Sequence, residues 1–396
     1  MLGLMQNQQL LISSLIEFAE RHHGEGEIVS RRVEGDIHRY TYKEVAVRSR
    51  QVANALDALK LQFSDRVATL AWNGYRHLEL YFGVSGSGRV LHTLNPRLHP
   101  DQIAWITEHA EDQVLCFDMS FLPIVKAIHG KCSTIKHYIA LCDADKLPAD
   151  TGIPGLVSYE AWIGGQPAKY AWPQFDENSA SSMCYTSGTT GNPKAALYSH
   201  RSTMLHAFAG ALPDALCLSA RDSILPVVPM FHVNAWGLPY AAAMTGAKLV
   251  FPGPAMDGKS IFELIESEKV SFAAGVPTVW QMMLGHMQAG GLRFSTLIFG
   301  QIMIAKGDVN LGPDDLPRSI LCRLSPRLER PDVAPRLRLG QIHRRGPLAA
   351  DDFRQIIDLL LRRPMRLQRL DRSHAEHRTQ RKAKVCRVEV LHQRRR

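Results

Sequence analysis

A run of ten residues rich in hydroxyl side chains and glycine, residues 185–194, has the clearest chemical meaning in the sequence. Glycine lets backbone N–H groups approach a polyphosphate, serine and threonine hydroxyls add donors, and a lysine supplies positive charge. The candidate phosphate-binding residues are Thr186, Ser187, Gly188, Thr189, Thr190, Gly191 and Lys194. This is not a Walker A loop, because Lys194 follows Pro193 and precedes Ala195. An unspecialised Ser/Thr/Gly turn is the alternative interpretation.

The segments around this run predict how it would be held. An apolar run ends at Cys184, and a helix-like segment covers residues 200–207. Across residues 1–300, short β-rich runs alternate with helical periods, which is typical of an α/β fold with crossover helices. Strands are predicted at 67–71, 90–94, 114–117, 225–229, 248–251 and 270–274, and helices after Thr41, around 78–82, from Pro100 and at 121–128. We therefore predict layered sheets with crossover helices.

The ten-residue run resembles the phosphate-binding signature of the adenylate-forming superfamily, which includes acyl-CoA synthetases, luciferases and the adenylation domains of peptide synthetases. The resemblance implies the N-terminal domain fold of these enzymes. It also implies that the loop from Thr186 to Lys194 holds the β and γ phosphates of ATP. The superfamily usually has glycine after the lysine, where this chain has Ala195.

Further segments extend the resemblance over residues 10–299 and indicate the fatty acid CoA ligase branch. They are Leu-Ala-Trp-Asn at 70–73, Thr-Leu-Asn-Pro-Arg-Leu at 93–98, His-Ala-Glu-Asp at 109–112, Ser-His-Arg-Ser at 199–202 and the run 225–237. The resemblance implies that His232 and Trp236 flank the acyl group and that Gly275 and Pro277 border its tunnel. From the residues alone, His232 is equally explained as a hydrogen-bonded histidine at a strand end, Trp236 as core packing and Pro277 as a helix start.

The resemblance also implies a reaction in two steps, with ATP, Mg²⁺ and CoA. A carboxylate attacks the α-phosphorus of ATP to give an acyl adenylate and pyrophosphate, and the CoA thiol then displaces AMP. The implied substrate is a fatty acid of medium chain length. The superfamily continues with a Tyr-Gly-x-Thr-Glu segment and a small C-terminal domain carrying a catalytic lysine, but residues 301–396 contain no tyrosine and no such pattern. We therefore assign no catalytic residue and no metal ligand, and expect impaired activity.

The last hundred residues differ from the rest in composition. Residues 301–396 carry 23 Lys and Arg against 11 Asp and Glu, whereas residues 1–300 carry 24 against 27, so the excess positive charge lies in the tail. Twenty of those 23 are Arg and Phe353 is the sole aromatic residue, which favours an irregular or disordered tail. We predict a partial N-terminal domain at 1–299, with subdomains of about 1–175 and 176–299, and an Arg-rich tail at 300–396 produced by a shifted reading frame.

Three functional hypotheses follow. The first is a truncated fatty acid CoA ligase homologue, the second a non-catalytic remnant that binds nucleotide, and the third a nucleic-acid binder that uses the basic tail. We expect no nucleic-acid partner, because the tail has only three lysines among its 23 basic residues and carries no group of stacking aromatic residues. No apolar run reaches 18 residues, no secretory leader is visible, and the seven cysteines lack metal or disulfide spacing. We expect a cytoplasmic protein with no transmembrane segment, and the sequence does not indicate an oligomeric state.

Overall fold

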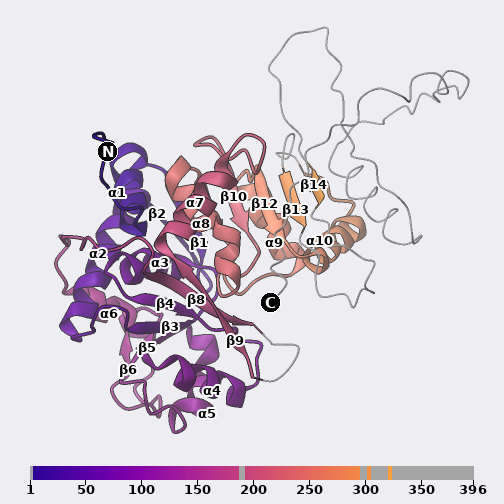
Figure 1. Ribbon diagram of the computed structural model, residues 1–396. Helices are drawn as coiled ribbons and strands as arrows, with labels where there is room; N and C mark the ends of the chain where they lie inside the picture. Colours follow the sequence, from indigo (N-terminus) through magenta and orange to yellow (C-terminus); the bar gives the residue numbers. More distant parts are fainter. Residues whose placement is uncertain (1–2, 187–191, 295–300, 305–319, 323–396) are drawn as a thin grey trace, which may run out of the picture. The chain divides into compact units, whose positions relative to one another are not determined.

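The computed structural model describes residues 3–186, 192–294, 301–304 and 320–322, with the backbone alone for the last two ranges. The strands form two seven-stranded sheets, called sheet A and sheet B below. Figure 1 shows β10, β12, β13 and β14 of sheet A above β3, β4, β8 and β9 of sheet B. Most neighbouring strands run parallel, with helices between them in sequence. The predicted α/β class is confirmed.

Sheet A takes strands from two distant parts of the chain. In spatial order they are β14 (Ile320–Cys322), β13 (Gln301–Ile304), β12 (Phe272–Gly275), β10 (Ser223–Pro226), β11 (Lys248–Phe251), β1 (Glu27–Arg31) and β2 (Ile37–Thr41). The edge strands β2 and β14 are antiparallel to their neighbours, and the others are parallel. Since β13 pairs with β12, the sheet continues past residue 299, where the tail was predicted to begin.

Sheet B is built in the same way. Its strands, in spatial order, are β7 (Val157–Ser158), β6 (His137–Ala140), β5 (Asp112–Phe117), β3 (Arg66–Leu70), β4 (Val90–Thr93), β8 (Ala180–Thr186) and β9 (Lys194–Ser199). Only β9 runs antiparallel to its neighbour. The subdomain boundary expected near residue 175 does not separate the two sheets, because β1 and β2 belong to sheet A while β8 and β9 belong to sheet B.

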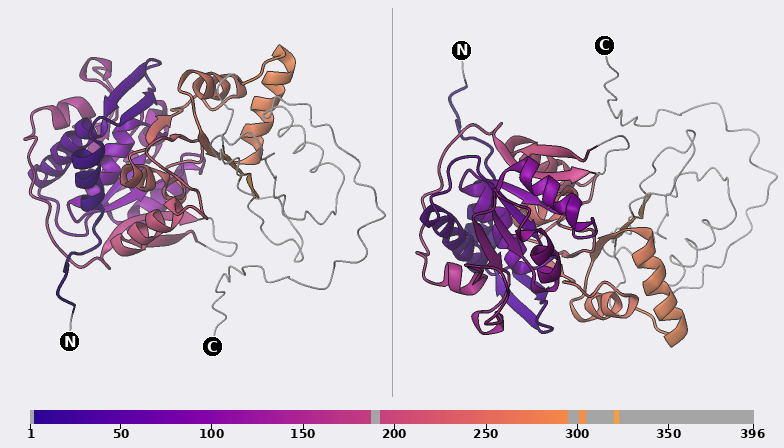
Figure 2. Two further views of the ribbon diagram at one scale, coloured as in Figure 1. Left: turned by 90° about the horizontal axis from the view of Figure 1, so that it is seen from above. Right: turned by 90° about the horizontal axis from the view of Figure 1, so that it is seen from below.

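Helices cover the sheets and lie between them. Those of the described residues are α1 (Ile12–His23), α2 (Tyr42–Ala58), α3 (Tyr75–Gly86), α4 (Pro100–Ala110), α5 (Leu122–His129), α6 (Tyr159–Gly164), α7 (His200–Ala211), α8 (Leu238–Thr245), α9 (Gly258–Ser267) and α10 (Pro277–Gly290). Single 3-10 turns are η1 (Met119–Phe121), η2 (Ala144–Lys146) and η3 (Val233–Gly237). Figure 2 shows α9 and α10, in orange, side by side.

The main core joins the two sheets through α3. Every residue of α3 is buried, and its core cluster includes Ile28 and Leu249 from sheet A together with Val67 and Leu91 from sheet B. A second cluster fills the other face of sheet B beneath α4 and α5. The helix also buries Arg76, His77 and Glu79, and each of these polar side chains has a hydrogen-bond partner. The arrangement places α3 where it can contact functional segments of both sheets.

Local sequence signals explain several element boundaries. Thr41 and Glu44 form the predicted capping box at the start of α2. Pro100 occupies the first turn of α4, and α10 begins at Pro277 and ends at Gly290, followed by the C-cap residue Gly291, whose φ is +60°. The largest difference at a strand end is in β10, which ends at Pro226 instead of residue 229. The edge strand β9 was not predicted.

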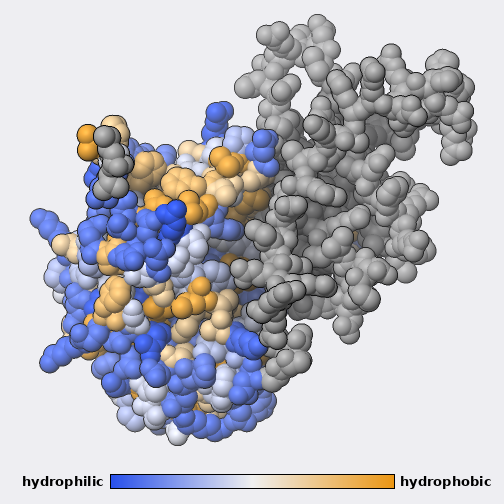
Figure 3. All heavy atoms as spheres, in the orientation of Figure 1, coloured by the Kyte–Doolittle hydropathy of each residue, from blue (hydrophilic) through white to orange (hydrophobic). Residues whose placement is uncertain are grey.

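The face drawn in Figure 3 carries several apolar residues among hydrophilic ones. On α7, Leu205 and Phe208 are exposed, and Leu212 and Leu197 of β9 are exposed nearby in the sequence. Within the described residues, no helix is long and apolar enough to cross a membrane. Five described cysteines are free thiols, four of them buried. Apart from β13 and β14, the predictions for the tail fall outside the described residues.

Candidate functional site

The ends of the predicted phosphate loop form an antiparallel hairpin. Thr186 ends β8 and Lys194 begins β9, and the two residues pair directly across the ladder. The hydroxyl of Thr186 donates to the Lys194 carbonyl oxygen at 3.5 Å, and both side chains are exposed. Five predicted phosphate-binding residues lie outside the described residues: Ser187, Gly188, Thr189, Thr190 and Gly191. The hairpin therefore leaves the Lys194 ammonium group free to face solvent or an anion near the loop.

Ala195 occupies the position where the superfamily usually has glycine. It pairs with Tyr185 inside β9, and its side chain is exposed. Glycine is required where φ is positive or where another backbone approaches closely, and an extended strand position with an open side imposes neither condition. The methyl group of Ala195 is therefore accommodated without backbone strain.

Tyr185 anchors the base of this hairpin in the second core. Its hydroxyl lies 2.6 Å from Nδ1 of His109, whose ring stacks on Trp105 with ring centroids 4.7 Å apart. Burial raises the pKa of Tyr185, so the phenol stays protonated at neutral pH. This contact ties the last buried residue before the loop to α4. Sequence reasoning placed His109 only within a family-like segment and assigned it no contact.

The second predicted site follows β10. Residues 226–237, here called the β10–α8 segment, end in a left-handed 3-10 turn. The φ angles of Val233, Asn234, Ala235 and Trp236 are 49°, 49°, 48° and 56°. Each non-glycine residue in this conformation costs roughly 1–2 kcal/mol. Consecutive strained residues persist only where surrounding contacts specify the path, and such strain is concentrated at functional sites.

Asn73, in the loop between β3 and α3, specifies the first part of that path. Its side-chain amide donates to the carbonyl oxygens of Pro226 at 2.7 Å and Val228 at 2.9 Å. Its side-chain oxygen accepts from the N–H of Met230 at 2.7 Å. Asn73 occupies the carbonyls of Pro226 and Val228, while the N–H groups of Val227 and Val228 both donate to the Ala274 carbonyl of β12, so regular strand pairing stops at Pro226.

Three other polar side chains hold the rest of the segment. The hydroxyl of Tyr81 donates to the Met230 carbonyl, and the hydroxyl of Thr93 donates to the Phe231 carbonyl at 3.2 Å. Asn234 donates from its side-chain amide to the Ser182 hydroxyl at 2.9 Å. Since Ser182 lies on β8, the strained turn is bonded to the strand that leads into the phosphate loop.

His232 and Trp236 both belong to the β10–α8 segment. The His232 side chain is exposed, and its backbone N–H donates to the Pro229 carbonyl at 3.1 Å. Trp236 is partly buried and packs against the main core. Core packing, the alternative explanation for Trp236, thus accounts for part of its surface. The turn ends at Gly237, where a Cβ would lie 2.6 Å from Nδ1 of His206.

Gly275 ends the neighbouring strand, β12, and Pro277 follows it. β10 and β12 pair with Pro226 opposite Ala274, so the segments after both strands leave the same edge of sheet A. Gly275 is buried, and a Cβ there would lie 2.7 Å from the Trp280 ring, which excludes larger residues. Pro277 is partly buried at the first turn of α10, as expected for a helix start. The four predicted acyl-site residues therefore come from two adjacent strand ends.

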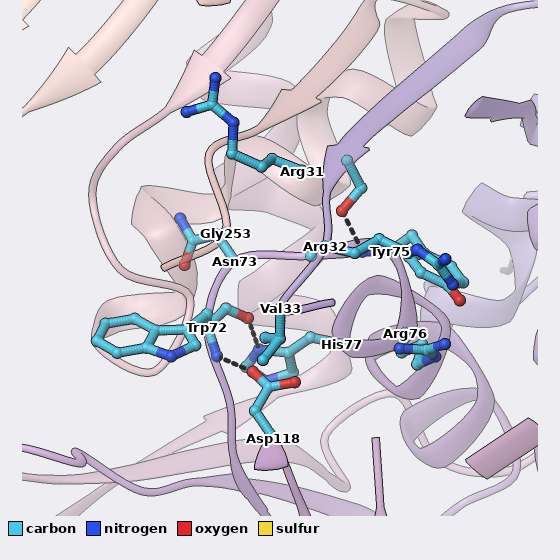
Figure 4. A pocket seen from close by; sticks show the side chains of 12 residues that line it. Arg31, Arg32, Val33, Trp72, Asn73, Tyr75, Arg76, His77, Asp118 and Gly253 are labelled. Carbon is cyan, nitrogen blue, oxygen red and sulfur yellow. Dashed lines mark hydrogen bonds between the residues drawn. The ribbon is translucent and has the colours of Figure 1, made fainter. Parts of the chain in front are cut away.

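A small pocket lies beside the Trp72–Asn73 loop, at the ends of β1, β3 and β5 (Figure 4). Its Asp118 is buried, and one carboxylate oxygen accepts from the Trp72 N–H at 2.7 Å. Burial raises the pKa of Asp118 to about 7, and the hydrogen bond from Trp72 opposes this only in part. On the other side of the loop, Nδ1 of His77 lies 3.1 Å from the Trp72 carbonyl oxygen. The loop that carries Asn73 is thus fixed from both sides.

Sequence reasoning missed the residues that fix the β10–α8 segment. Asn73 and Thr93 appeared only inside family-like segments, and Tyr81 and Ser182 were not singled out. The available signal was a set of polar residues placed at or just after buried strands, or on an otherwise buried helix. Among the described residues, no three His, Cys, Asp or Glu side chains are grouped to hold a metal ion.

Comparisons with known proteins identify the family of the chain. A family model for AMP-binding enzymes matches residues 16–330. The chain is 54% identical over 297 residues to a medium-chain fatty acid CoA ligase of Ectopseudomonas oleovorans, covering 75% of this chain and 54% of the relative. It is 44% identical over 319 residues to a long-chain fatty acid CoA ligase of Thermus thermophilus, covering 81% and 56%.

A third relative is a 3-methylmercaptopropionyl-CoA ligase of Ruegeria lacuscaerulensis, which is 50% identical over 297 residues, covering 75% of this chain and 55% of the relative. The fold is similar to the crystal structure of the anthranilate CoA ligase AuaEII with anthranoyl-AMP, with a TM-score of 0.64 at 22% identity, covering 74% of this chain and 55% of that one. The chain spans about half the length of the curated relatives it matches.

Proposed function

Because this chain belongs to the AMP-binding enzyme family, we propose that residues 1–299 are the ATP-binding and fatty-acid-binding part of a fatty acid CoA ligase. The two relatives that act on fatty acids support this substrate class, and the higher identity to the medium-chain enzyme supports a medium chain length. We also propose that the protein works in the cytoplasm, where ATP and CoA are available.

One observation carries the proposal. The Asn234 amide is hydrogen-bonded to the Ser182 hydroxyl at 2.9 Å, and Ser182 lies on β8, whose end leads into the phosphate loop. A ligase must bring a carboxylate against the α-phosphorus of ATP, so its acyl site and phosphate site must be adjacent. A rigid link between the β10–α8 segment and β8 supports that adjacency.

The proposed roles follow from exposure and position. Thr186, Lys194 and the residues between them would hold the ATP phosphates, with the exposed Lys194 ammonium near the negative charge. His232 and Trp236 would flank the fatty acid carboxylate and chain. Gly275 and Pro277 would border the chain beyond them, where the close approach of Trp280 to Gly275 leaves room for no side chain.

The proposed chemistry needs little covalent participation by the protein. A carboxylate oxygen bonds to the α-phosphorus of ATP, and the bond to the leaving pyrophosphate breaks. The CoA thiolate then bonds to the acyl carbon, and AMP leaves. Mg²⁺ bound to ATP would neutralise phosphate charge. We further propose that this chain is impaired in both steps, because residues 301–396 contain no tyrosine and so no Tyr-Gly-x-Thr-Glu segment.

Binding and turnover by the purified chain test the proposal separately. We expect saturable binding of Mg-ATP and of octanoate by calorimetry, with little release of pyrophosphate and little octanoyl-CoA. Absence of ATP binding would refute the proposed function. Turnover comparable to that of the full-length medium-chain relative would refute only the impairment.

Two alternatives give different results in the same experiments. A non-catalytic nucleotide-binding remnant would bind ATP without octanoate and release no pyrophosphate. A nucleic-acid binder would show affinity for DNA or RNA that falls steeply with salt and disappears when residues 301–396 are deleted.

A further inference from the structure

We propose that Asn73 is a positioning residue for the fatty acid site, acting through the backbone of the β10–α8 segment. The inference rests on the proposed function. Asn73 follows a strand of sheet B, whereas His232 and Trp236 follow a strand of sheet A and are far from Asn73 in the sequence. Asn73 is 1% exposed and lies in the loop between β3 of sheet B and α3.

The three hydrogen bonds described for the Asn73 side chain all go to the backbone of the β10–α8 segment. Both amide hydrogens are used, one on the Pro226 carbonyl and the other on the Val228 carbonyl, and the oxygen accepts from Met230. An amide side chain carries two donors and an acceptor in one plane, as does the edge of a neighbouring strand. Asn73 therefore bonds to residues 226–230 in place of a neighbouring strand. Unlike a strand, it leaves these residues in an irregular backbone conformation.

The surroundings fix Asn73 itself. Its backbone carbonyl accepts from the Gly253 N–H at 3.1 Å, which ties the loop to the end of β11. The preceding residue, Trp72, donates its N–H to Asp118, and its carbonyl oxygen accepts from Nδ1 of His77 at 3.1 Å. The loop that carries Asn73 is thus hydrogen-bonded on several sides. The position of the Asn73 amide is therefore fixed, and so are the backbone groups of the β10–α8 segment that it binds.

The backbone conformation of the β10–α8 segment depends on these contacts from outside the segment. Residues 227–232 form no regular element, and the left-handed residues 233–236 are intrinsically unfavourable. If the bonds at Pro226, Val228 and Met230 are lost, the turn can relax toward right-handed or extended backbone. His232 and Trp236 would then move together, because both lie on the released backbone.

The informative substitution is Asn73→Asp, which keeps the size and the acceptor for Met230 but removes both donors. Asn54→Asp is the matched control. The Asn54 amide also donates to backbone carbonyls, those of Arg50, Pro167 and Lys169, but it lies between α2 and residues 167–169. Both variants thus lose the same kind of bond, at different places in the fold.

The full chain carrying each substitution is examined by hydrogen exchange and calorimetry. For Asn73→Asp we expect exchange in the peptide covering residues 226–237 to rise about tenfold or more, and octanoate affinity to fall about tenfold, with ATP affinity changed less than twofold. For Asn54→Asp we expect unchanged exchange in that peptide and unchanged octanoate affinity. Equal exchange and equal affinity in the two variants would overturn the inference.

Two further outcomes are distinguishable. If the unmodified chain binds ATP but not octanoate, the acyl part of the proposed function fails, and unchanged exchange at residues 226–237 in Asn73→Asp would independently refute the positioning. If Asn73→Asp does not fold, Thr93→Val serves instead, because it removes the hydroxyl that donates to the Phe231 carbonyl at 3.2 Å and more weakly to the Met183 carbonyl at 3.5 Å. We then expect about a threefold loss of octanoate affinity, and no loss would overturn the claim that these bonds position the site.

Discussion

Helix α3 takes part in two regions that are held in opposite ways. At its start, Arg76 forms ion pairs with Glu34, Asp143 and Glu160, and the pairs with Glu34 and Glu160 are both 2.8 Å long. Further along, Tyr81 joins the neutral amides and hydroxyls that bind the β10–α8 segment. The charged region joins α3 and α6 through short turns that carry Glu34 and Asp143, whereas the neutral region holds an irregular, strained backbone.

The difference shows which interactions suit each task. A guanidinium group can join several carboxylates from separate elements, but its partners change charge with pH. Burial opposes ionisation of Glu160, yet Arg48 and Arg76 outweigh it and lower the pKa of Glu160. Backbone carbonyls and N–H groups have no charge to match, so neutral donors and acceptors hold them at any pH near neutral.

The largest expected effect comes from breaking the charged region. Arg76→Met keeps most of the side-chain volume but leaves Glu34, Asp143 and Glu160 without their shared cation. Because Arg76 is only 6% exposed at its side chain, we expect the free energy of unfolding to fall by about 3–5 kcal/mol in urea denaturation. Lys259→Met is the control, since its partner Glu263 lies 3.9 Å away at the surface. Equal stability of the two variants would contradict the distinction between the regions.

The next effect concerns Asp118, at the pocket beside both regions. With a pKa of about 7 in the folded state, this carboxyl binds its proton more tightly than in the unfolded chain, so it favours folding at low pH. That contribution is lost as pH rises through about 7. Relative to Asp118→Asn, we expect the native chain to lose about 2–3 kcal/mol of stability between pH 5 and pH 8. If the unfolding free energies of the two proteins changed with pH in parallel, the pKa of Asp118 would not be raised in the folded state.

A smaller effect is expected in the neutral region itself. Asn234→Ala removes the bond to Ser182 and places an alanine at a φ of 49°, so we expect a loss of about 2 kcal/mol in unfolding free energy. Asn234→Gly removes the same bond, but glycine adopts the left-handed backbone without strain. The unfolding free energy should therefore fall less in this variant than in Asn234→Ala. If glycine were as damaging as alanine, the turn would not be strained.

The smallest effect sharpens the comparison with respect to pH. Tyr81→Phe removes the hydroxyl that donates to the Met230 carbonyl and lies 3.5 Å from the Asn234 side-chain oxygen, which we expect to cost about 1 kcal/mol. Burial raises the pKa of Tyr81 well above its usual value, so the loss should be the same at pH 5 and pH 8. Urea unfolding at both values provides the measurement, and a pH-dependent difference would contradict a neutral role.

Much of the fold followed from local patterns in the sequence. The strand at 248–251 and the capping box at Thr41 were predicted as observed, because each depends on neighbouring residues alone. The pairing of β1 with β11 could not be predicted, since it joins distant segments without a local signal. The early end of β10 was missed for the same reason, because the competing partner is the side chain of Asn73.

In the candidate site, too, the features that depend on neighbouring residues were predicted and those that depend on distant contacts were not. The loop residues Thr186 and Lys194 were found from their types and spacing, and the structure pairs them at the hairpin ends. The left-handed turn at 233–237 has an ordinary composition, with one glycine at its end, and nothing in Val233 or Ala235 indicates a positive φ. Its conformation comes from tertiary contacts, which a pattern along the chain does not contain.

The order of residues along the chain has a consequence for synthesis. The four side chains that hold the β10–α8 segment are Asn73, Tyr81, Thr93 and Ser182, and all of them precede residues 226–237. A chain emerging from the ribosome therefore presents every one of these partners before the segment that needs them. A circular permutant that begins near residue 212 would reverse this sequence of events, so residues 226–237 would leave the ribosome with nothing yet made to shape them.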